Sequence, residues 1–171
     1  MTDGQQTPPR TRTITWDDPM VGAQFGLGKS GLDYMHAMLA GQVPSPPISI
    51  LMNFRLAEVE NGRALFVCTP DEFHYNPIGV VHGGLICTLC DSACGCAVHT
   101  TLPAGMAYTT LDVHVHMTRP LSAQTGEIRC EGRVLHAGRR MATAEAKVTD
   151  ARGKLYGHAT STCMIFPLNE G

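Results

Sequence analysis

Residues 75–103 read YNPIGVVHGGLICTLCDSACGCAVHTTLP, and this stretch decides the fold of the chain. It opens with turn-forming residues and then reaches the sequence His82-Gly83-Gly84. From there the chain runs to Pro103 without another proline and with a single carboxylate, Asp91. This pattern predicts a loop that leads into a helix.

Apolar residues after the glycine pair recur at three- and four-residue steps, which places them on one stripe of a helix. The stripe contains Ile86, Leu89, Cys90, Ala93 and Ala97. Lys, Arg and Glu are absent, so we expect a helix that is packed on most of its surface. A carboxylate in apolar surroundings is unfavourable unless it is paired, hydrogen-bonded or neutralised. Asp91 is therefore a functional candidate.

The glycine pair at the expected helix start is a second candidate. The first N–H groups of a helix have no partner within it, and glycine lets a ligand approach them closely. Gly83 could therefore bind a carbonyl oxygen that becomes negative during acyl transfer. Gly83 and Asp91 are 91 − 83 = 8 residues apart, which is about 12 Å along one helix. If both act on one acyl carbon, Asp91 must come from a second copy whose helix runs antiparallel across a twofold axis.

Together these residues resemble the signature of the hotdog-fold acyl-CoA thioesterases, in particular their phenylacetate-catabolism branch. The resemblance spans roughly residues 48–166, and its motif positions are Asn76, Gly79, His82, Gly83, Gly84, Leu89, Asp91, Ala93 and Ala97. It implies an α+β fold, a single hotdog domain in which an antiparallel sheet of five or six strands wraps one long central helix. It also implies two active sites at a dimer interface. We expect a homodimer as the minimal unit and a homotetramer as the assembly.

The resemblance further implies hydrolysis of an acyl-CoA, with an aromatic or medium-chain acyl group and without a metal or redox cofactor. Asp91 would attack the thioester carbonyl or deprotonate water, while the Gly83 amide polarises the carbonyl. Asn76 and His82 would position the carbonyl or the leaving thiolate. Thr110 would help to orient the water.

Some of these positions have a plainer interpretation. Asn76-Pro77 is also common turn chemistry, and His82 could serve only to shape the loop. Thr109 stands next to Thr110 and blurs the alignment at that position. Arg139 and Arg140, in an expected turn, could contact the phosphates or adenosine end of coenzyme A, although a solvated turn also explains them.

Two other patterns could indicate different chemistry. Cys87-x-x-Cys90 has the spacing of a redox or zinc pair, but the second ligand pair and the strand-to-helix setting are missing. We therefore interpret these cysteines as part of an apolar helix stripe. Asp112-x-His114-x-His116 on one strand could hold a metal, although antiparallel sheets often have a polar outer face of this kind.

The rest of the chain reads as an arm, a second helix and strands. Residues 1–28 are rich in Gln, Thr, Pro and Gly, which predicts an arm that is poorly ordered or draped over a domain of residues 29–171. A helix is expected between Ser30 and Gly41. Its predicted inner face contains Leu32, Met35, His36 and Leu39.

Alternation and turn signals predict six strands. They cover residues 48–59, 64–68, 106–118, 126–136, 141–149 and 154–165, with a tight hairpin at Asn61-Gly62 between the first two. In the segment 106–118, one face contains Leu111, Val113, Val115 and Met117. The opposite face contains Thr110, Asp112, His114 and His116.

Composition excludes several classes of function. Thirteen basic and fifteen acidic residues give a net charge of −2, which argues against a nucleic-acid surface or a polybasic membrane anchor. No apolar run reaches the roughly 18 residues of a membrane span, and the N-terminus lacks an apolar signal region. We expect one cytoplasmic domain whose partner is the acyl-CoA substrate.

Two alternatives to a thioesterase stay open. The same domain could bind acyl-CoA as a sensor, but the short arm shows no helix-turn-helix pattern for a DNA-binding segment. The domain could also hydrate an enoyl-CoA, but the related hydratases use a paired Asp and His in a different sequence setting.

Overall fold

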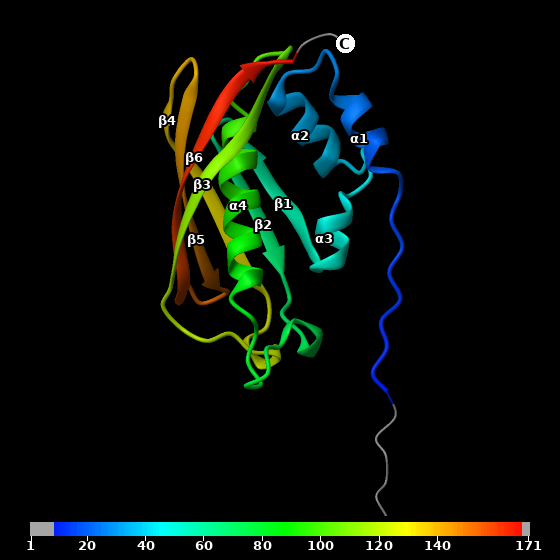
Figure 1. Ribbon diagram of the computed structural model, residues 1–171, viewed down its shortest axis with the longest axis vertical. Coiled ribbons are helices and arrows are strands. Elements are labelled where there is room, and N and C mark those ends of the chain that lie inside the picture. Colours follow the sequence, from blue (N-terminus) through cyan, green and yellow to red (C-terminus); the bar gives the residue numbers. More distant parts are fainter. Residues whose placement is uncertain (1–8, 169–171) are drawn as a thin grey trace, which may run out of the picture.

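In the computed structural model, which describes residues 9–168, six strands form one antiparallel sheet in the order β1-β2-β4-β5-β6-β3. The strands are β1 (Phe54–Glu60), β2 (Arg63–Cys68), β3 (Met106–Met117), β4 (Ile128–Ala137), β5 (Met141–Asp150) and β6 (Leu155–Pro167). The sheet curves around one long helix, α4 (Gly84–His99), as predicted (Figure 1).

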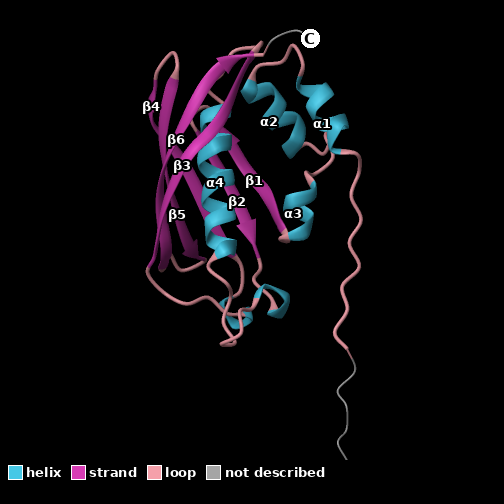
Figure 2. Ribbon diagram, viewed as in Figure 1, coloured by secondary structure: helices cyan, strands magenta, loops and turns pink. Residues whose placement is uncertain are grey.

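Three shorter helices lie on the β1 side of the sheet (Figure 2). They are α1 (Pro19–Gly26), α2 (Gly31–Leu39) and α3 (Pro47–Leu51). Two short 3-10 turns, η1 (Glu72–His74) and η2 (Ala123–Thr125), lie in the loops at the N-terminal end of α4.

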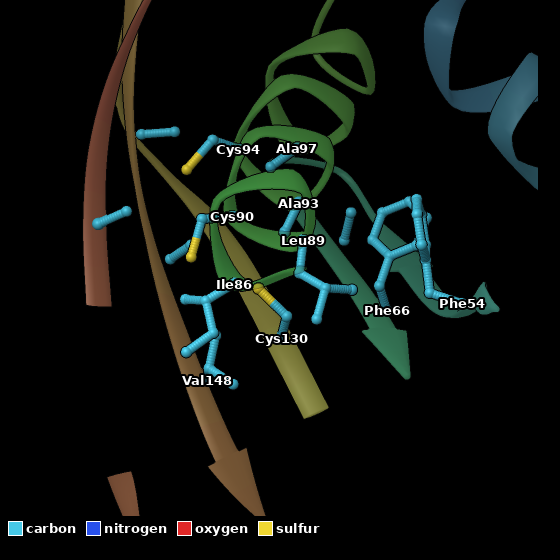
Figure 3. Close-up of a cluster of buried hydrophobic side chains, with 14 of the residues drawn as sticks. Phe54, Phe66, Ile86, Leu89, Cys90, Ala93, Cys94, Ala97, Cys130 and Val148 are labelled. Carbon is cyan, nitrogen blue, oxygen red and sulfur yellow. The ribbon is translucent and has the colours of Figure 1, made fainter. Parts of the chain in front are cut away.

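The side of α4 that faces the sheet forms the centre of the core. The predicted apolar stripe is confirmed, because Leu89, Cys90, Ala93 and Ala97 have no exposed surface and Ile86 is only 3% exposed. Phe54 and Phe66 pack on one flank of this face, and Cys130 and Val148 pack on the other (Figure 3).

The opposite side of α4 differs from the expectation of a helix packed nearly all round. Cys87, Thr88, Ser92 and Cys96 are only partly buried, and Asp91 is exposed. The sheet reaches only part of the way around the helix, so a polar stripe stays open to contact from outside the chain.

The predicted strand over residues 48–59 is wrong in its first half. Pro47 occupies the first turn of α3, where its fixed φ favours a helix and its missing N–H is not needed. Asn53, with a φ of 54°, then turns the chain into β1. The Asn61-Gly62 hairpin and the remaining five strands are confirmed to within a few residues.

The predicted arm, residues 1–28, lies partly outside the described residues. Its described part contains helix α1, which the sequence did not indicate. Before α1, the guanidinium group of Arg12 donates to the carbonyl oxygens of Ile50 and Leu51, at 2.8 Å each. The proposed boundary at residue 28 stays a prediction.

Helix α2 was predicted correctly in extent but not in its buried face. The Ser30 hydroxyl accepts the Asp33 N–H at 3.2 Å, as expected of an N-cap. Met35 is buried as predicted, whereas His36 is exposed and Leu39 is 42% exposed. Gly31 explains the rotation of the helix, because it packs so closely on the α4 end at His99 that any side chain there would overlap the His99 carbonyl.

A β-bulge at Leu111 corrects the predicted faces of β3. Thr110 pairs with Cys163 and Asp112 pairs with Thr162, so Leu111 has no partner in β6. Cys163 is fully buried toward α4, and Thr110 therefore faces the helix instead of sharing the outer face with Asp112. Bulges re-aim side chains in this way, and this one turns Thr110 toward Asp91.

Candidate functional site

The N-terminal end of α4 presents a backbone donor. Gly83 is the N-cap, and no side chain caps the helix. The neighbouring Gly84 N–H donates to the Nδ1 atom of His82 at 2.9 Å. Within residues 9–168, no hydrogen bond engages the Gly83 N–H. This amide at the helix start is available to a ligand oxygen.

Asn76 holds the loop that delivers these glycines. Its Oδ1 atom accepts the N–H groups of Ile78 and Val80, at 3.1 and 3.3 Å. The side-chain oxygen of Asn76 is therefore used within the turn, as the plainer interpretation predicts. The NH₂ group of the same side chain can still donate to a substrate. Nearby His74 is buried, with its ring nitrogens bonded to the Asp71 N–H and the Met52 carbonyl oxygen.

Asp91 and Thr110 are brought together. The Thr110 hydroxyl donates to Oδ1 of Asp91 at 2.9 Å, across from the middle of α4 to the edge strand β3. Thr109 pairs with the outward-facing Met164 and is exposed, so Thr110 is the one of the two threonines that reaches the carboxylate. The bulge at Leu111 produces this arrangement.

A cavity of about 250 Å³ opens beside Asp91 on the uncovered side of α4. Its lining combines the Asp91–Thr110 pair with mainly apolar side chains from α2, α3, α4, β1, β2 and β3. The apolar part consists of Met38, Pro46, Ile48, Phe54, Leu56, Phe66, Cys96 and Tyr108. A polar pair at the wall of an apolar cavity is the usual form of a small-molecule site.

A second hollow, of about 540 Å³, lies at the N-terminal end of α4. His82 and Gly84 line it, together with Tyr75, Leu85 and Arg12. The glycine loop and the Asp91 carboxylate therefore border two separate hollows, two helical turns apart on one chain. In a single chain they do not converge on one atom.

Arg139 and Arg140 are not part of either hollow. They are exposed in the β4–β5 turn, which lies at the upper end of the sheet in Figure 1, whereas the loop before α4 lies at the lower end. They border a shallow surface depression with Met106, Leu111 and Met164.

The structure also shows how the residues of the alternative metal and redox patterns are arranged. Asp112 accepts the Thr162 N–H at 3.2 Å, and its carboxylate lies 3.9 Å from the exposed His114. The ring of His116 stacks on that of His158 instead. In the part of the chain that the structure describes, no group of three or more His, Cys, Asp or Glu side chains is placed to hold a metal ion. All seven cysteines are free thiols, and burial raises the pKa of the Cys87 thiol.

Sequence reasoning missed most of the cavity wall. Apart from Asp91 and Thr110, its residues come from six elements and belong to no motif. One signal was available: Gly95 interrupts a helix interior, where glycine is unfavourable, and a close neighbour is a common reason for such a residue. That neighbour is Tyr108.

Comparisons with known proteins show which proteins this chain is similar to. A family model described as the thioesterase superfamily matches residues 78–156. A curated protein of Saccharolobus solfataricus, named as a candidate esterase, is 29% identical over 114 residues, which cover 67% of this chain and 79% of that protein.

Solved structures share the fold. A phenylacetic acid degradation-related protein of Ralstonia eutropha, a candidate thioesterase, is 28% identical with a TM-score of 0.69, over 77% of this chain and 98% of that one. A Streptococcus mutans protein bound to acetyl CoA is 26% identical with a TM-score of 0.61, over 67% and 90%. The resemblance to hotdog-fold thioesterases, including the phenylacetate branch, is confirmed.

Among residues 9–168, no helix combines the length and the apolar character needed to span a membrane.

Proposed function

The chain matches the thioesterase superfamily in sequence and in fold, and on that premise we propose that it hydrolyses acyl-CoA thioesters to a free acid and coenzyme A. The observation that carries the proposal is Asp91, held by Thr110 at the wall of an apolar cavity. An acyl group would occupy the cavity, and its thioester would lie beside the carboxylate. The acetyl CoA bound to the Streptococcus mutans relative supports coenzyme A as the leaving group.

The active unit that we propose is a homodimer with sites shared between subunits. Asp91 and Gly83 lie about 12 Å apart along α4, so one chain cannot direct both at the same carbon. The polar side of α4 and the edge strand β3 are both left uncovered by the chain itself. An antiparallel twofold pairing through this side would bring the Gly83 amide of one subunit to the Asp91 of the other. A homotetramer would follow from pairing two such dimers.

In this arrangement the reaction needs two groups. The Gly83 N–H donates to the thioester oxygen and stabilises the negative charge that develops there. Asp91 removes a proton from water, and the resulting hydroxide adds to the carbonyl carbon. The C–S bond then breaks, and the departing thiolate takes up the proton. Direct attack by Asp91, which gives an anhydride that water then opens, uses the same geometry.

The other candidate residues support these two. Thr110 orients the Asp91 carboxylate, and through it the water. His82 fixes the loop through its bond to the Gly84 N–H, and the Asn76 amide remains free to donate to the thioester oxygen.

We further propose that Arg139 and Arg140 serve the site of the other subunit. The Arg140 carbonyl oxygen accepts the N–H of Ile165, which pairs with Tyr108 near the start of β3. Antiparallel pairing of two β3 strands would set this end beside the end of the partner strand, next to the partner's glycine loop. Two guanidinium groups there suit the phosphates of coenzyme A.

Thiol release from a panel of aromatic and aliphatic acyl-CoAs tests the proposed function, with native protein, Asp91→Ala and Asp91→Asn compared. We expect turnover by the native protein and a loss of about a hundredfold or more in both variants. Tight binding of acyl-CoA by the native protein without any thiol release would favour the sensor instead.

A further inference from the structure

We propose that Tyr108 forms the end wall of the acyl cavity and sets the longest acyl chain that the protein accepts. This inference rests on the proposed function, because it takes the cavity beside Asp91 as the acyl site. It assigns a specificity role to a residue outside the motif.

The cavity extends from Asp91 toward the C-terminal end of α4. Cys96 follows Asp91 by five residues, which is about 7.5 Å along the helix. Tyr108 precedes Thr110 by two residues, which is about 6.6 Å along β3. Both of these residues line the cavity, whereas His99, further along α4, does not. The cavity therefore ends at the level of Cys96 and Tyr108.

The Tyr108 ring lies between the cavity and His99. The ring centroids of Tyr108 and His99 are 5.5 Å apart, and His99 is in turn 5.4 Å from the ring of Tyr34 on α2. Three rings from β3, α4 and α2 thus follow one another behind the cavity. Because each ring packs on the next, Tyr108 cannot swing away from the cavity without displacing His99.

Gly95 is the residue that lets the tyrosine lie in this position. A Cβ atom at Gly95 would be 2.8 Å from the Cε2 and hydroxyl oxygen of Tyr108, so a side chain there would force the ring to move. Glycine in a helix interior is less favourable than alanine. The pair Gly95–Tyr108 is consistent with a helix that gives up this stability to place an aromatic wall.

The end wall is uncharged. Burial is the main cause that raises the pKa of the Tyr108 phenol well above its usual value, and burial also raises the pKa of the Cys96 thiol to about 12. Phe54 and Phe66, in an edge-to-face contact at 5.7 Å, form the apolar part of the side walls, which also include Arg55 and Ser92. An acyl chain directed away from Asp91 therefore meets mainly apolar walls and stops at the Tyr108 ring.

Chain-length profiles test this role. We would measure kcat/KM for straight-chain acyl-CoAs from acetyl to dodecanoyl with native protein, Tyr108→Ala, Tyr108→Phe and Gly95→Ala. In the native protein, kcat/KM should fall by about tenfold for each methylene that exceeds the cavity. Tyr108→Ala should restore the longer chains by about tenfold or more and change acetyl-CoA by less than about threefold.

The other two variants test whether the position of the Tyr108 ring sets the chain-length cut-off. Tyr108→Phe keeps the ring and should keep the native cut-off. Gly95→Ala pushes the ring into the cavity and should move the cut-off to shorter chains. Tyr156→Ala removes a buried tyrosine at the opposite end of the β3–β6 pair and should lower stability without moving the cut-off. An unchanged cut-off in Tyr108→Ala would overturn the inference.

A binding experiment separates this inference from the proposed reaction. Calorimetric titration with S-alkyl-CoA thioethers, from ethyl to dodecyl, measures the cavity without any turnover. If the native protein cleaves no thioester but the thioether cut-off moves in Tyr108→Ala, hydrolysis is wrong and the end wall stands. If thioesters are cleaved and neither cut-off moves, the end wall is wrong and hydrolysis stands. Tyr108→Leu, which retains apolar volume, replaces Tyr108→Ala if the latter fails to fold.

Discussion

Helix α4 is sixteen residues long, and its two sides have opposite character. Toward the sheet, Leu89, Ala93 and Ala97 are fully buried among apolar neighbours. Away from the sheet, Asp91 is exposed and bonded to Thr110. One side of the helix holds the fold together and the other carries the proposed site, so stability and activity should respond to different substitutions on one element.

The largest effect is expected at the start of the polar side. Gly83→Pro removes the N–H donor, and the φ of −58° at this position suits proline. We expect kcat to fall by about 100- to 1000-fold, as for other losses of an oxyanion donor. Gly83→Ala is the matched control, because it adds a Cβ against the flexible end of Met117 but keeps the amide. Equal losses of kcat in both variants would show that the atoms added at residue 83, and not the missing N–H, cause the loss.

Mixing two inactive variants tests whether the polar side works in pairs. Asp91→Ala and Gly83→Pro subunits, unfolded and refolded together, should form mixed dimers in which one of the two sites is intact. Random pairing gives about a quarter of native activity. If activity stays at the level of the separate variants, both groups must act within one chain.

On the buried side, Leu89→Ala should destabilise the protein by about 2–5 kcal/mol, because the side chain is fully buried and its removal leaves a cavity. Urea unfolding measures this change. Ser92→Ala, on the polar side of the same helix, should change stability by less than about 0.5 kcal/mol. Similar losses in both would contradict the division between the two sides.

Thr110→Val sharpens the comparison on the polar side alone. It removes the hydrogen bond to Asp91 and should lower kcat/KM by about tenfold, the equivalent of one hydrogen bond to a charged group. Thr109→Val, one residue away on the exposed outer side of β3, should leave kcat/KM unchanged. A larger loss of kcat/KM in Thr109→Val than in Thr110→Val would show that Thr109, and not Thr110, supports Asp91.

The smallest effect concerns pH at the C-terminal end of α4. Burial lowers the pKa of His99 below its ordinary value of 6.5. The unfolded chain therefore binds a proton at this residue more readily than the folded chain does, so stability falls as the pH decreases below 6.5. His99→Gln should reduce this slope in unfolding measured between pH 7 and pH 5.

Much of the fold could be predicted from the sequence because its signals are local. The period of the apolar residues places α4, and the Asn61-Gly62 turn places the first hairpin. The glycine and the carboxylate of the candidate site stand out in the sequence because their spacing on one helix is fixed. Their meeting across a twofold axis is still a prediction.

The remainder depends on contacts that no local pattern encodes. Ile48, Ser49 and Ile50 suit a strand by propensity, but Pro47 and the packing of α3 on β1 make them helical. The bulge at Leu111 leaves no mark in the alternation of β3, yet it decides which face Thr110 occupies. The buried face of α2 depends on the approach of Gly31 to His99, which is a tertiary contact.

The strand order has a consequence for how the chain is made. Strand β3 precedes β4, β5 and β6 in the sequence, but in the sheet it pairs only with β6. During synthesis, the strand that carries Thr110 therefore leaves the ribosome well before its hydrogen-bonding partner exists. Asp91 can meet Thr110 in its final position only after the last strand has been added, so this hydrogen-bonded pair is among the last contacts to form.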